Sequence, residues 1–377
     1  MLPLILIDAT PLRADSGRRG IGRYVRELLH GLVETRDDWR RELRVEAVED
    51  LSVAGGCLVA SDLAGVAERA FAARGTRQRG MGLARRFSLG RVASERGAAL
   101  LHLTEPLGTP LSCPVPCLLT CHDLIALRFP EQYLGGAVAR ALGRRRERRR
   151  YARAGHVVAI SETSARDARR HAGAREVSVI PHGIDLRRFE LLPAVGSERP
   201  FVLYVGGSDY RKNVEGMLGA LALARSSVDV ELAWAGWLKP AHARQVRAMA
   251  RAAGVERHVR LLGFVSDEEL VALYRRAAAH LFLSRLEGFG LTVVEAMAAG
   301  CPVIVARGSS SDELAGPAGV VVDADDRVAA GAAIVSLIRD HRLRSELAAQ
   351  GRERARHFER RRMARDYAAL YAELCRR

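Results

Sequence analysis

The chain has 377 residues, of which 48% are hydrophobic and 27% are charged. This composition is typical of a soluble globular protein, and the length favours two domains over a single hydrophobic core. Six cysteines are too few for a disulfide scaffold, and no apolar run approaches the roughly 20 residues of a membrane span. The stretch from Leu2 to Ile7 is too short for a signal-peptide core and has no basic flank. We therefore expect a cytoplasmic protein, or one at the inner face of the membrane.

The formal net charge is +15 at pH 7 and the sequence pI is about 10.4. Most of the basic excess lies in the first half of the chain, and nearly all of it is arginine. Such a surface suits phosphate-bearing partners, which include nucleic acid, anionic lipid and nucleotide ligands. The alternative is compositional, because a chain rich in Ala, Gly and Arg is also what a GC-rich genome encodes.

The first strand is expected at residues 4–8, and the first amphipathic helix covers Val25 to Leu32. A glycine-rich turn at residues 15–24 separates them, and its Gly20 and Gly22 could bring backbone N–H groups close to a diphosphate. The glycine order is not that of the dinucleotide fingerprint, so a nicotinamide or flavin cofactor is disfavoured. An ordinary tight turn remains the alternative.

Residues 35–98 give no clear pattern, and buried strands then follow at 100–103 and 117–120. The second strand leads directly into His122 and Asp123. A histidine at the carboxyl end of a strand is well placed for chemistry, although a structural histidine in a turn fits the same pattern. Cysteines recur every fourth residue from position 113 to position 121, which is not the spacing of a zinc knuckle, so we expect no metal site.

Residues 137–154 form a predicted helix with a dense arginine face. This helix could dock on anionic lipid head groups, or it could be a solvated surface helix. Nucleic acid is the weaker candidate partner, because no aromatic platform or nucleic-acid motif accompanies the arginines. The face is made of these arginines: Arg140, Arg144, Arg145, Arg146, Arg148, Arg149, Arg150 and Arg153.

A second series of alternating strands and helices starts at Phe201, after a polar segment at 186–200 that we interpret as a linker. This alternation predicts a second parallel, doubly wound sheet. Its strands are expected near 201–205, 230–235, 259–262, 281–283, 303–305 and 320–322. A final amphipathic helix, roughly Arg360 to Cys375, needs a surface to cover, and we expect that surface on the first domain.

Two loops of the second half carry candidate chemistry. Gly207 is followed by the adjacent cations Arg211 and Lys212, just beyond the carboxyl end of a strand. Two cations beside backbone donors suit a diphosphate leaving group, although an ordinary basic loop has the same composition.

The other loop places Glu287 before a glycine-aromatic-glycine turn and Glu295 eight positions later. Two carboxylates near a sugar nucleotide can accept hydrogen bonds from paired hydroxyls. A capping box formed by Thr292 and Glu295 is the structural alternative for the second glutamate, and a solvated loop carboxylate is the alternative for the first. A glycosidase pair fits less well, because its carboxyl groups flank a scissile bond.

Taken together, these motifs resemble the retaining glycosyltransferases of family 4, which have the GT-B fold. The resemblance covers nearly the whole chain, and it is closest to bacterial mannosyltransferase-like members that build surface polysaccharides. It rests on the Glu287 to Glu295 element, the first glycine loop, His122-Asp123, Pro181-His182-Gly183-Ile184-Asp185 and Arg211-Lys212-Asn213. It implies an α/β protein of two doubly wound Rossmann-like domains facing a central cleft. Residues 1–190 would form the acceptor side and residues 191–358 the donor side, with residues 359–377 packing back on the first domain.

The resemblance also implies a role for each site residue. Arg211 and Lys212 would bind the donor diphosphate, and Glu295 would take the ribose hydroxyls. His122 would contact the transferred sugar. The remaining positions would hold the sugar, approach the phosphate or border the base: Gly20, Gly22, Gly207, Phe264, Glu287, Gly288, Phe289, Gly290, Leu291 and Thr292. The family transfers with retention and without a catalytic metal, and the leaving phosphate is thought to take the acceptor's proton.

The predicted function is therefore transfer of a hexose from a nucleotide-diphosphate sugar, with GDP-mannose as the first guess. The acceptor would be a sugar or a lipid-linked sugar in glycan or polysaccharide biosynthesis. Alternatives are a small secondary metabolite as acceptor, a GT-B nucleotide-sugar epimerase, and a basic protein that binds membrane or nucleic acid without catalysis.

Overall fold

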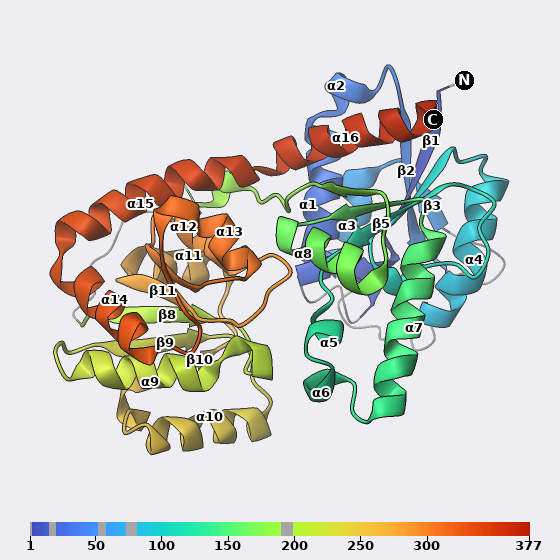
Figure 1. Cartoon of the computed structure of the whole chain (residues 1–377). Coiled ribbons are helices and arrows are strands. Elements are labelled where there is room, and N and C mark those ends of the chain that lie inside the picture. Colours follow the sequence, from blue (N-terminus) through green and yellow to red (C-terminus); the bar gives the residue numbers. More distant parts are fainter. Residues whose placement is uncertain (1, 15–19, 52–57, 73–80, 190–198) are drawn as a thin grey trace. The chain divides into compact units, whose positions relative to one another are not determined.

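The structure is a computed structural model, and it describes residues 2–14, 20–51, 58–72, 81–189 and 199–377. The chain divides into two compact units. The first unit consists of Met1–Asp185 together with Phe358–Arg377, and the second is Leu186–His357. Each unit is an α/β sandwich around its own sheet, coloured blue to green in the first unit and yellow to orange in the second (Figure 1).

The first unit contains a seven-stranded sheet in the order β3-β2-β1-β4-β5-β6-β7. Every neighbouring pair is parallel except β2 and β3. Parallel sheets are covered on both faces, which explains why a strand such as β1 is apolar and buried at each position up to Asp8. The strands are β1 Leu4–Asp8, β2 Arg44–Asp50, β3 Leu58–Ala60, β4 Leu100–Leu103, β5 Cys117–Cys121, β6 His156–Ala159 and β7 Val177–Val179.

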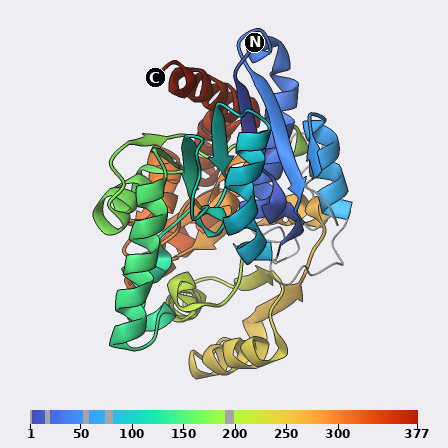
Figure 2. The same ribbon diagram turned by 90° about the vertical axis from the view of Figure 1, so that its right-hand side faces the viewer.

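Helices flank this sheet on both sides, as the two perpendicular views show (Figures 1 and 2). None of the described helices in either unit combines the length and apolar character needed to cross a bilayer. The helices of the first unit are α1 Gly20–Glu34, α2 Arg36–Trp39, α3 Leu63–Ala72, α4 Met81–Glu95, α5 Ile125–Arg128, α6 Pro130–Tyr133, α7 Ala137–Arg153, α8 Glu162–Asp167 and α16 Arg360–Arg376.

The second unit contains six parallel strands in the order β10-β9-β8-β11-β12-β13. The order reverses between β8 and β11, and ligands of open α/β sheets bind beyond the carboxyl ends of the strands at such a switch point. The strands are β8 Phe201–Val205, β9 Glu231–Ala235, β10 Val259–Gly263, β11 Ala279–Phe282, β12 Val303–Ala306 and β13 Gly319–Val322. The helices are α9 Val214–Arg225, α10 Pro240–Ala252, α11 Asp267–Arg276, α12 Leu291–Ala298, α13 Ser310–Ala315, α14 Arg327–Arg339 and α15 His341–Ala355.

The last helix, α16, returns to the first unit and packs against α1. The two helices come so close that a Cβ atom on Gly31 would lie 2.7 Å from the Arg360 carbonyl oxygen. Arg360 is buried and forms ion pairs with Glu27, Glu34 and Asp185. A cation shared by three carboxylates therefore holds the end of the chain onto the first unit.

Replacement of this cation is expected to loosen the terminal helix. Arg360→Ala leaves three partly buried carboxylates without their shared partner, and we expect it to lower the free energy of unfolding by about 3 kcal/mol. Arg365→Ala is the matched control, because Arg365 lies on the same helix, is half exposed, and pairs at 2.7 Å with half-exposed Asp38 on α2. The control should cost less than about 1 kcal/mol. Denaturant unfolding of both variants measures the difference, and equal losses would contradict the role given to Arg360.

Candidate functional site

The two candidate cations, Arg211 and Lys212, lie in a short turn just after β8, at the switch point of the second sheet. The next residue, Asn213, fixes this turn. It has a left-handed backbone with φ of +55°, and its side-chain amide donates to the carbonyls of Leu283 at 3.1 Å and Ala324 at 2.6 Å. The same side chain accepts from the Gly216 N–H and so caps α9. One asparagine thus ties the turn to the loops that follow β11 and β13.

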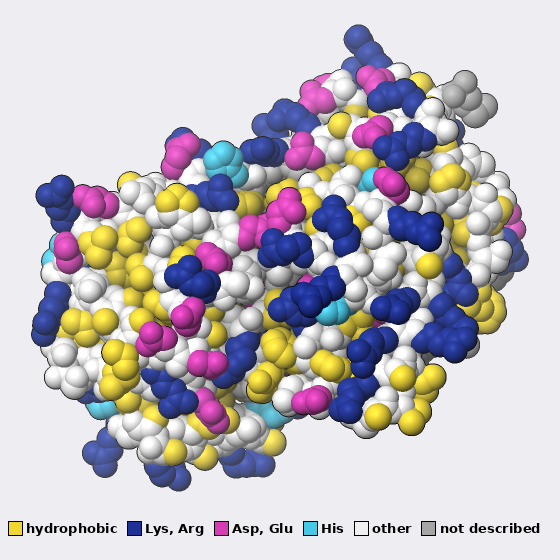
Figure 3. Space-filling model, viewed as in Figure 1, with side chains coloured by type: hydrophobic (Ala, Val, Ile, Leu, Met, Phe, Trp, Pro, Cys, Tyr) yellow, Lys and Arg dark blue, Asp and Glu magenta, His cyan; other side chains and the backbone are white. Residues whose placement is uncertain are grey.

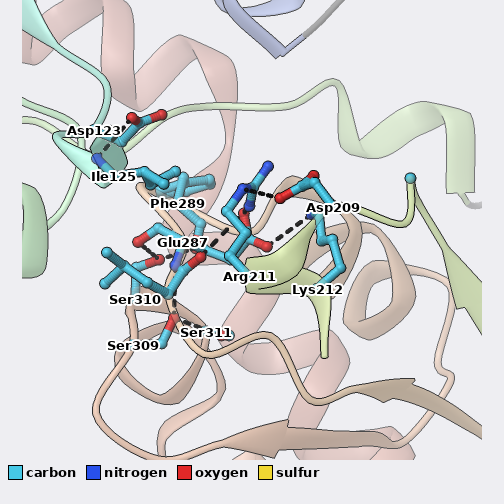
Figure 4. Close-up of polar contacts among 12 residues, drawn as sticks. Asp123, Ile125, Asp209, Arg211, Lys212, Glu287, Phe289, Ser309, Ser310 and Ser311 are labelled. Carbon is cyan, nitrogen blue, oxygen red and sulfur yellow. Dashed lines mark hydrogen bonds and ion pairs between the residues drawn. The ribbon is translucent and has the colours of Figure 1, made fainter. Parts of the chain in front are cut away.

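Glu287 brings the two cations together (Figure 4). One carboxylate oxygen accepts from the Arg211 guanidinium, and the other lies 2.7 Å from the Lys212 Nζ. Lys212 is 9% exposed and Glu287 is 8% exposed, so water screens this interaction little. The Lys212 Nζ also lies 4.9 Å from the centre of the Phe282 ring. Residues from two separate loops therefore form one cluster of opposite charges.

Burial and neighbouring charge act in opposite directions on this cluster. Burial alone would raise the pKa of Glu287, but Lys212 and Arg211 outweigh it and lower that pKa from its ordinary value of 4.5. Burial lowers the pKa of Lys212, and Arg211 adds to this effect, while Glu287 opposes it. A second carboxylate, that of Asp209, lies 3.2 Å from the Arg211 guanidinium, so the cluster holds two cations and two carboxylates (Figure 4).

A serine run after β12 holds the Glu287 loop in place. The Glu287 N–H donates to the Ser309 Oγ at 3.0 Å, and the Ser310 hydroxyl donates to the carbonyls of Glu287 and Phe289 (Figure 4). Ser311 donates to Ser309 at 3.1 Å, and all three serines are buried. The sequence reasoning assigned nothing to these serines. Their position at the carboxyl end of a strand, beside the switch point, was the available signal.

Gly290 explains how α12 begins. Its φ of +112° lies in a region that favours glycine, and the helix starts at Leu291. Thr292 is consequently inside the first turn, where its hydroxyl lies 3.3 Å from the Nε2 of His280. The capping box that could have explained Thr292 and Glu295 is therefore wrong, because the N-cap is Gly290 and no side chain caps it.

The remaining predicted residues of the second unit occupy different environments. Glu295 is buried on α12 and accepts a hydrogen bond from the Tyr274 hydroxyl at 3.2 Å. Phe264 is 79% exposed just after β10. Gly207 lies beyond β8, where a Cβ atom would meet nothing within 4 Å, so there is open space beside its backbone. The structure therefore brings Arg211, Lys212 and Glu287 into contact, while Glu295 contacts a different partner.

In the first unit, His122 directly follows β5 and is buried. Its Nε2 lies 2.7 Å from the Thr104 carbonyl oxygen. Because a carbonyl only accepts, Nε2 carries the proton and Nδ1 presents a lone pair. Burial lowers the pKa of His122, and the Thr104 carbonyl opposes that effect only in part. The ring is thus a neutral hydrogen-bond acceptor at Nδ1.

A network of buried polar side chains packs against His122 through Tyr24. The Tyr24 ring stands edge-on to His122, with ring centres 4.9 Å apart. The Tyr24 hydroxyl contacts Thr120 at 3.0 Å and the hydroxyl of Tyr367 on α16, and Thr120 lies 2.8 Å from the Nε2 of His102. Burial lowers the pKa of His102 to about 3, so this network is held together by neutral groups. Tyr24 belongs to the glycine-loop motif, but no sequence pattern indicated that the last helix would contact it.

The first-unit glycines can be placed only in part. Gly20 and Gly22 open helix α1, and Gly22 is buried there. Residues 15–19 of the preceding glycine-rich turn lie outside the described residues, as do 190–198 of the predicted linker and 52–57 and 73–80 of the segment without a clear pattern. Among the described residues, no three His, Cys, Asp or Glu side chains gather as a metal site would require. Cys117 and Cys121 are buried at the two ends of β5. Their four-residue spacing places both side chains on the same face of the sheet, which is ordinary for buried strand residues.

Comparison with known proteins supplies the family. A profile described as Glycosyltransferase Family 4 matches residues 18–188, and one described as Glycosyl transferases group 1 matches residues 193–354. Together they cover both units, with the boundary in the same region. The chain belongs to glycosyltransferase family 4. The predicted family is thereby confirmed.

Individual relatives of this family 4 chain are distant. The O-antigen chain mannosyltransferase B of Escherichia coli is 33% identical over 163 residues, which is 42% of each chain. The first three curated relatives are matched over only 39% to 42% of their own lengths.

Solved structures confirm the GT-B fold. Sucrose-phosphate synthase from Thermosynechococcus elongatus has a TM-score of 0.75 at 22% identity and covers 99% of both chains. Anabaena HepE, solved in complex with UDP-glucose, has a TM-score of 0.70 at 16% identity and covers 98% of this chain and 99% of its own. The predicted fold class of two doubly wound sheets is confirmed by this likeness and by the strand orders.

The charge cluster of this family 4 chain predicts a pH dependence. The folded-state pKa of Glu287 is lowered, so the ionised carboxylate stabilises the fold above its unfolded pKa of about 4.5. That contribution is lost as the pH falls through the lower, folded-state value. Glu287→Gln mimics the protonated form, so its melting temperature should lie below that of the parent at pH 7. The gap should narrow below pH 4.5. Melting temperatures from pH 7 to pH 3.5 measure it, and a constant gap would contradict the ionised cluster.

Proposed function

We propose that this chain transfers a hexose from a nucleotide-diphosphate sugar to a hydroxyl of a sugar or lipid-linked sugar. The observation that carries the proposal is the buried contact of Arg211 and Lys212 with Glu287 at the switch point of the second sheet. Two cations held there by one carboxylate suit a diphosphate, because each can form charge-assisted hydrogen bonds to phosphate oxygens. Glu287 is then suited to accept hydrogen bonds from sugar hydroxyls while it keeps the cations aligned.

The proposed reaction does not need a side chain that acts as general acid or general base. As the bond from the anomeric carbon to the phosphate oxygen breaks, negative charge grows on the diphosphate, where Arg211 and Lys212 stabilise it. The acceptor oxygen bonds to the anomeric carbon, and its proton passes to the released phosphate oxygen. In the first unit, neutral His122 is proposed to contact the transferred sugar through its Nδ1 lone pair. Transfer with retention is part of the same proposal.

Mannose is the proposed sugar and GDP the proposed nucleotide, because the E. coli relative is an O-antigen chain mannosyltransferase. A UDP-sugar is the competing donor, since Anabaena HepE was solved with UDP-glucose. Glu295 is proposed to hold the ribose, Phe264 to border the base, and Gly207 with the start of α12 to approach the donor. Gly20 and Gly22 are proposed to approach the phosphate from the first unit. A glycan under assembly is the proposed acceptor, and a small metabolite is the alternative.

Donor binding can be tested before any acceptor is known. In a panel of GDP-, UDP-, dTDP- and ADP-sugars, one donor near 100 times its Kd should raise the melting temperature by a few degrees. Lys212→Gln should lower the affinity for that donor by about 10- to 100-fold, because a hydrogen bond between charged groups is lost. Arg307→Gln is the control, since Arg307 is an exposed cation of the same unit that pairs with exposed Asp323. Equal donor affinity in the Lys212 variant would contradict the proposed diphosphate site.

Turnover separates transfer from the alternatives. Glu287→Gln and Lys212→Gln should each reduce the transfer rate by about 10²- to 10³-fold, the effect of removing one oriented charge at a reacting centre. Circular dichroism would check that both variants remain folded. Incubation of the donor without acceptor, followed by NMR of the sugar nucleotide, identifies an epimerase by its isomerised product. Isomerisation without any transfer, or full turnover in both variants, would overturn the proposal.

A further inference from the structure

Helix α7, Ala137–Arg153, has a packed side and an exposed side of different composition. The packed side runs through Gly143, Glu147, Arg150 and Tyr151, at the spacing of successive helical turns. Gly143 fits closely against Leu134, and a Cβ atom there would lie 3.0 Å from its side chain. Tyr151 belongs to the core of the first unit. These contacts fix which face of α7 points outward.

The packed side corrects one part of the predicted arginine face. Arg150 is buried and pairs with Glu147, so it does not belong to the exposed surface. Glu147 also lies 3.5 Å from Arg146. The only carboxylate of α7 therefore turns toward the body of the unit, and burial lowers the pKa of Arg150 there. The outward face consequently carries no negative side chain from its own helix.

The exposed side combines arginines with apolar residues. Arg144, Arg145, Arg149 and Arg153 are exposed, and no ion pair is recorded for them within the described part of the chain. Arg148 is exposed too, and its Nε is within 3.4 Å of the His171 carbonyl oxygen. A hollow of about 420 Å³ runs along this side, lined by Ala141, Arg144, Arg145, Arg148, Arg149 and Ala152.

Two large apolar side chains continue the same face toward the start of α7. Val138 is 74% exposed and Leu142 is 62% exposed, and they lie one turn apart. In the space-filling view, basic side chains gather over α7, and hydrophobic ones gather at its lower end (Figure 3). The arginines are hydrated in water, whereas the exposed apolar side chains beside them have no favourable partner there. They match the boundary between lipid head groups and acyl chains, where both kinds of side chain find partners.

We propose that the exposed face of α7 docks the first unit on an anionic lipid bilayer. The arginines bind lipid phosphates, and Val138 and Leu142 enter the boundary of the acyl chains. Charge selects this occupant: an arginine face with no outward carboxylate from its own helix complements a negative surface, and the apolar end distinguishes a bilayer from a nucleic-acid backbone. The proposal goes beyond the transfer reaction and does not depend on which donor is bound.

Vesicle co-sedimentation of the full chain tests this docking. Vesicles containing phosphatidylglycerol should bind the protein, vesicles of phosphatidylcholine alone should not, and raised salt should weaken binding. The combined variant Arg145→Gln, Arg148→Gln, Arg149→Gln should bind the anionic vesicles on the order of a hundredfold more weakly. The double variant Val138→Ser, Leu142→Ser should lower binding while leaving the charge unchanged, which isolates the apolar contribution.

The matched control removes the same charge from the second unit. Arg244, Arg247 and Arg257 are exposed on or just after α10, and their triple replacement by Gln should leave vesicle binding within about twofold of the parent. If both triple variants lose vesicle binding equally, net charge alone explains the binding, and the proposal that α7 is the docking face is wrong. Binding to DNA that depends on the α7 arginines, with no binding to anionic vesicles, would also overturn it. Because donor-induced melting shifts are measured separately, failure of docking leaves the proposed transfer reaction unaffected.

Discussion

The carboxylate of Glu287, shared between Arg211 and Lys212, is the interaction on which the candidate site depends. Buried Lys212 and partly buried Arg211 would repel each other, and burial already disfavours the charged form of Lys212. The Glu287 carboxylate offsets the repulsion between the two cations. The serines after β12 hold the Glu287 loop, and so the carboxylate, in position. Asn213 fixes the other side, because it joins the cation turn to the end of β11. The loops that follow β8, β11 and β12 are thereby joined to one another through Glu287 and Asn213.

A buried ion cluster contributes little net stability, since desolvation offsets most of the attraction. Its value here is in binding. The cluster pairs two cations with two carboxylates, Glu287 and Asp209, and lies where the strand order reverses, so its cations are already oriented for the proposed diphosphate. Preorganised charge of this kind costs no reorganisation when negative charge develops on the leaving group. The two cations are brought close together when the chain folds, before any ligand binds.

The sequence predicted most strands well because both sheets are parallel apart from the β2–β3 pair. Strands buried on two faces are continuous apolar runs, and β1, β5, β8 and β12 match the predicted positions closely. The cations and glutamates could be identified because they follow such strands directly. The capping box that was the structural alternative for Glu295 does not form, because a Thr-x-x-Glu pattern does not reveal that Gly290 adopts a left-handed backbone two residues before Thr292. The backbone conformation, and not the side-chain spacing, decides where a helix begins.

Contacts between distant segments were beyond the reach of the sequence. Nothing in the pattern of Ser309 and Ser310 shows that they will hold a loop some twenty residues earlier, and nothing near Tyr24 points to Tyr367 on the last helix. The arginines of α7 illustrate the same limit on one helix, where Arg149 and Arg150 are adjacent in sequence and identical in chemistry. One is exposed and the other is buried beside Glu147, because a helix turns by 100° at each residue. A charge run therefore predicts a basic surface only after the packed side of its helix is known.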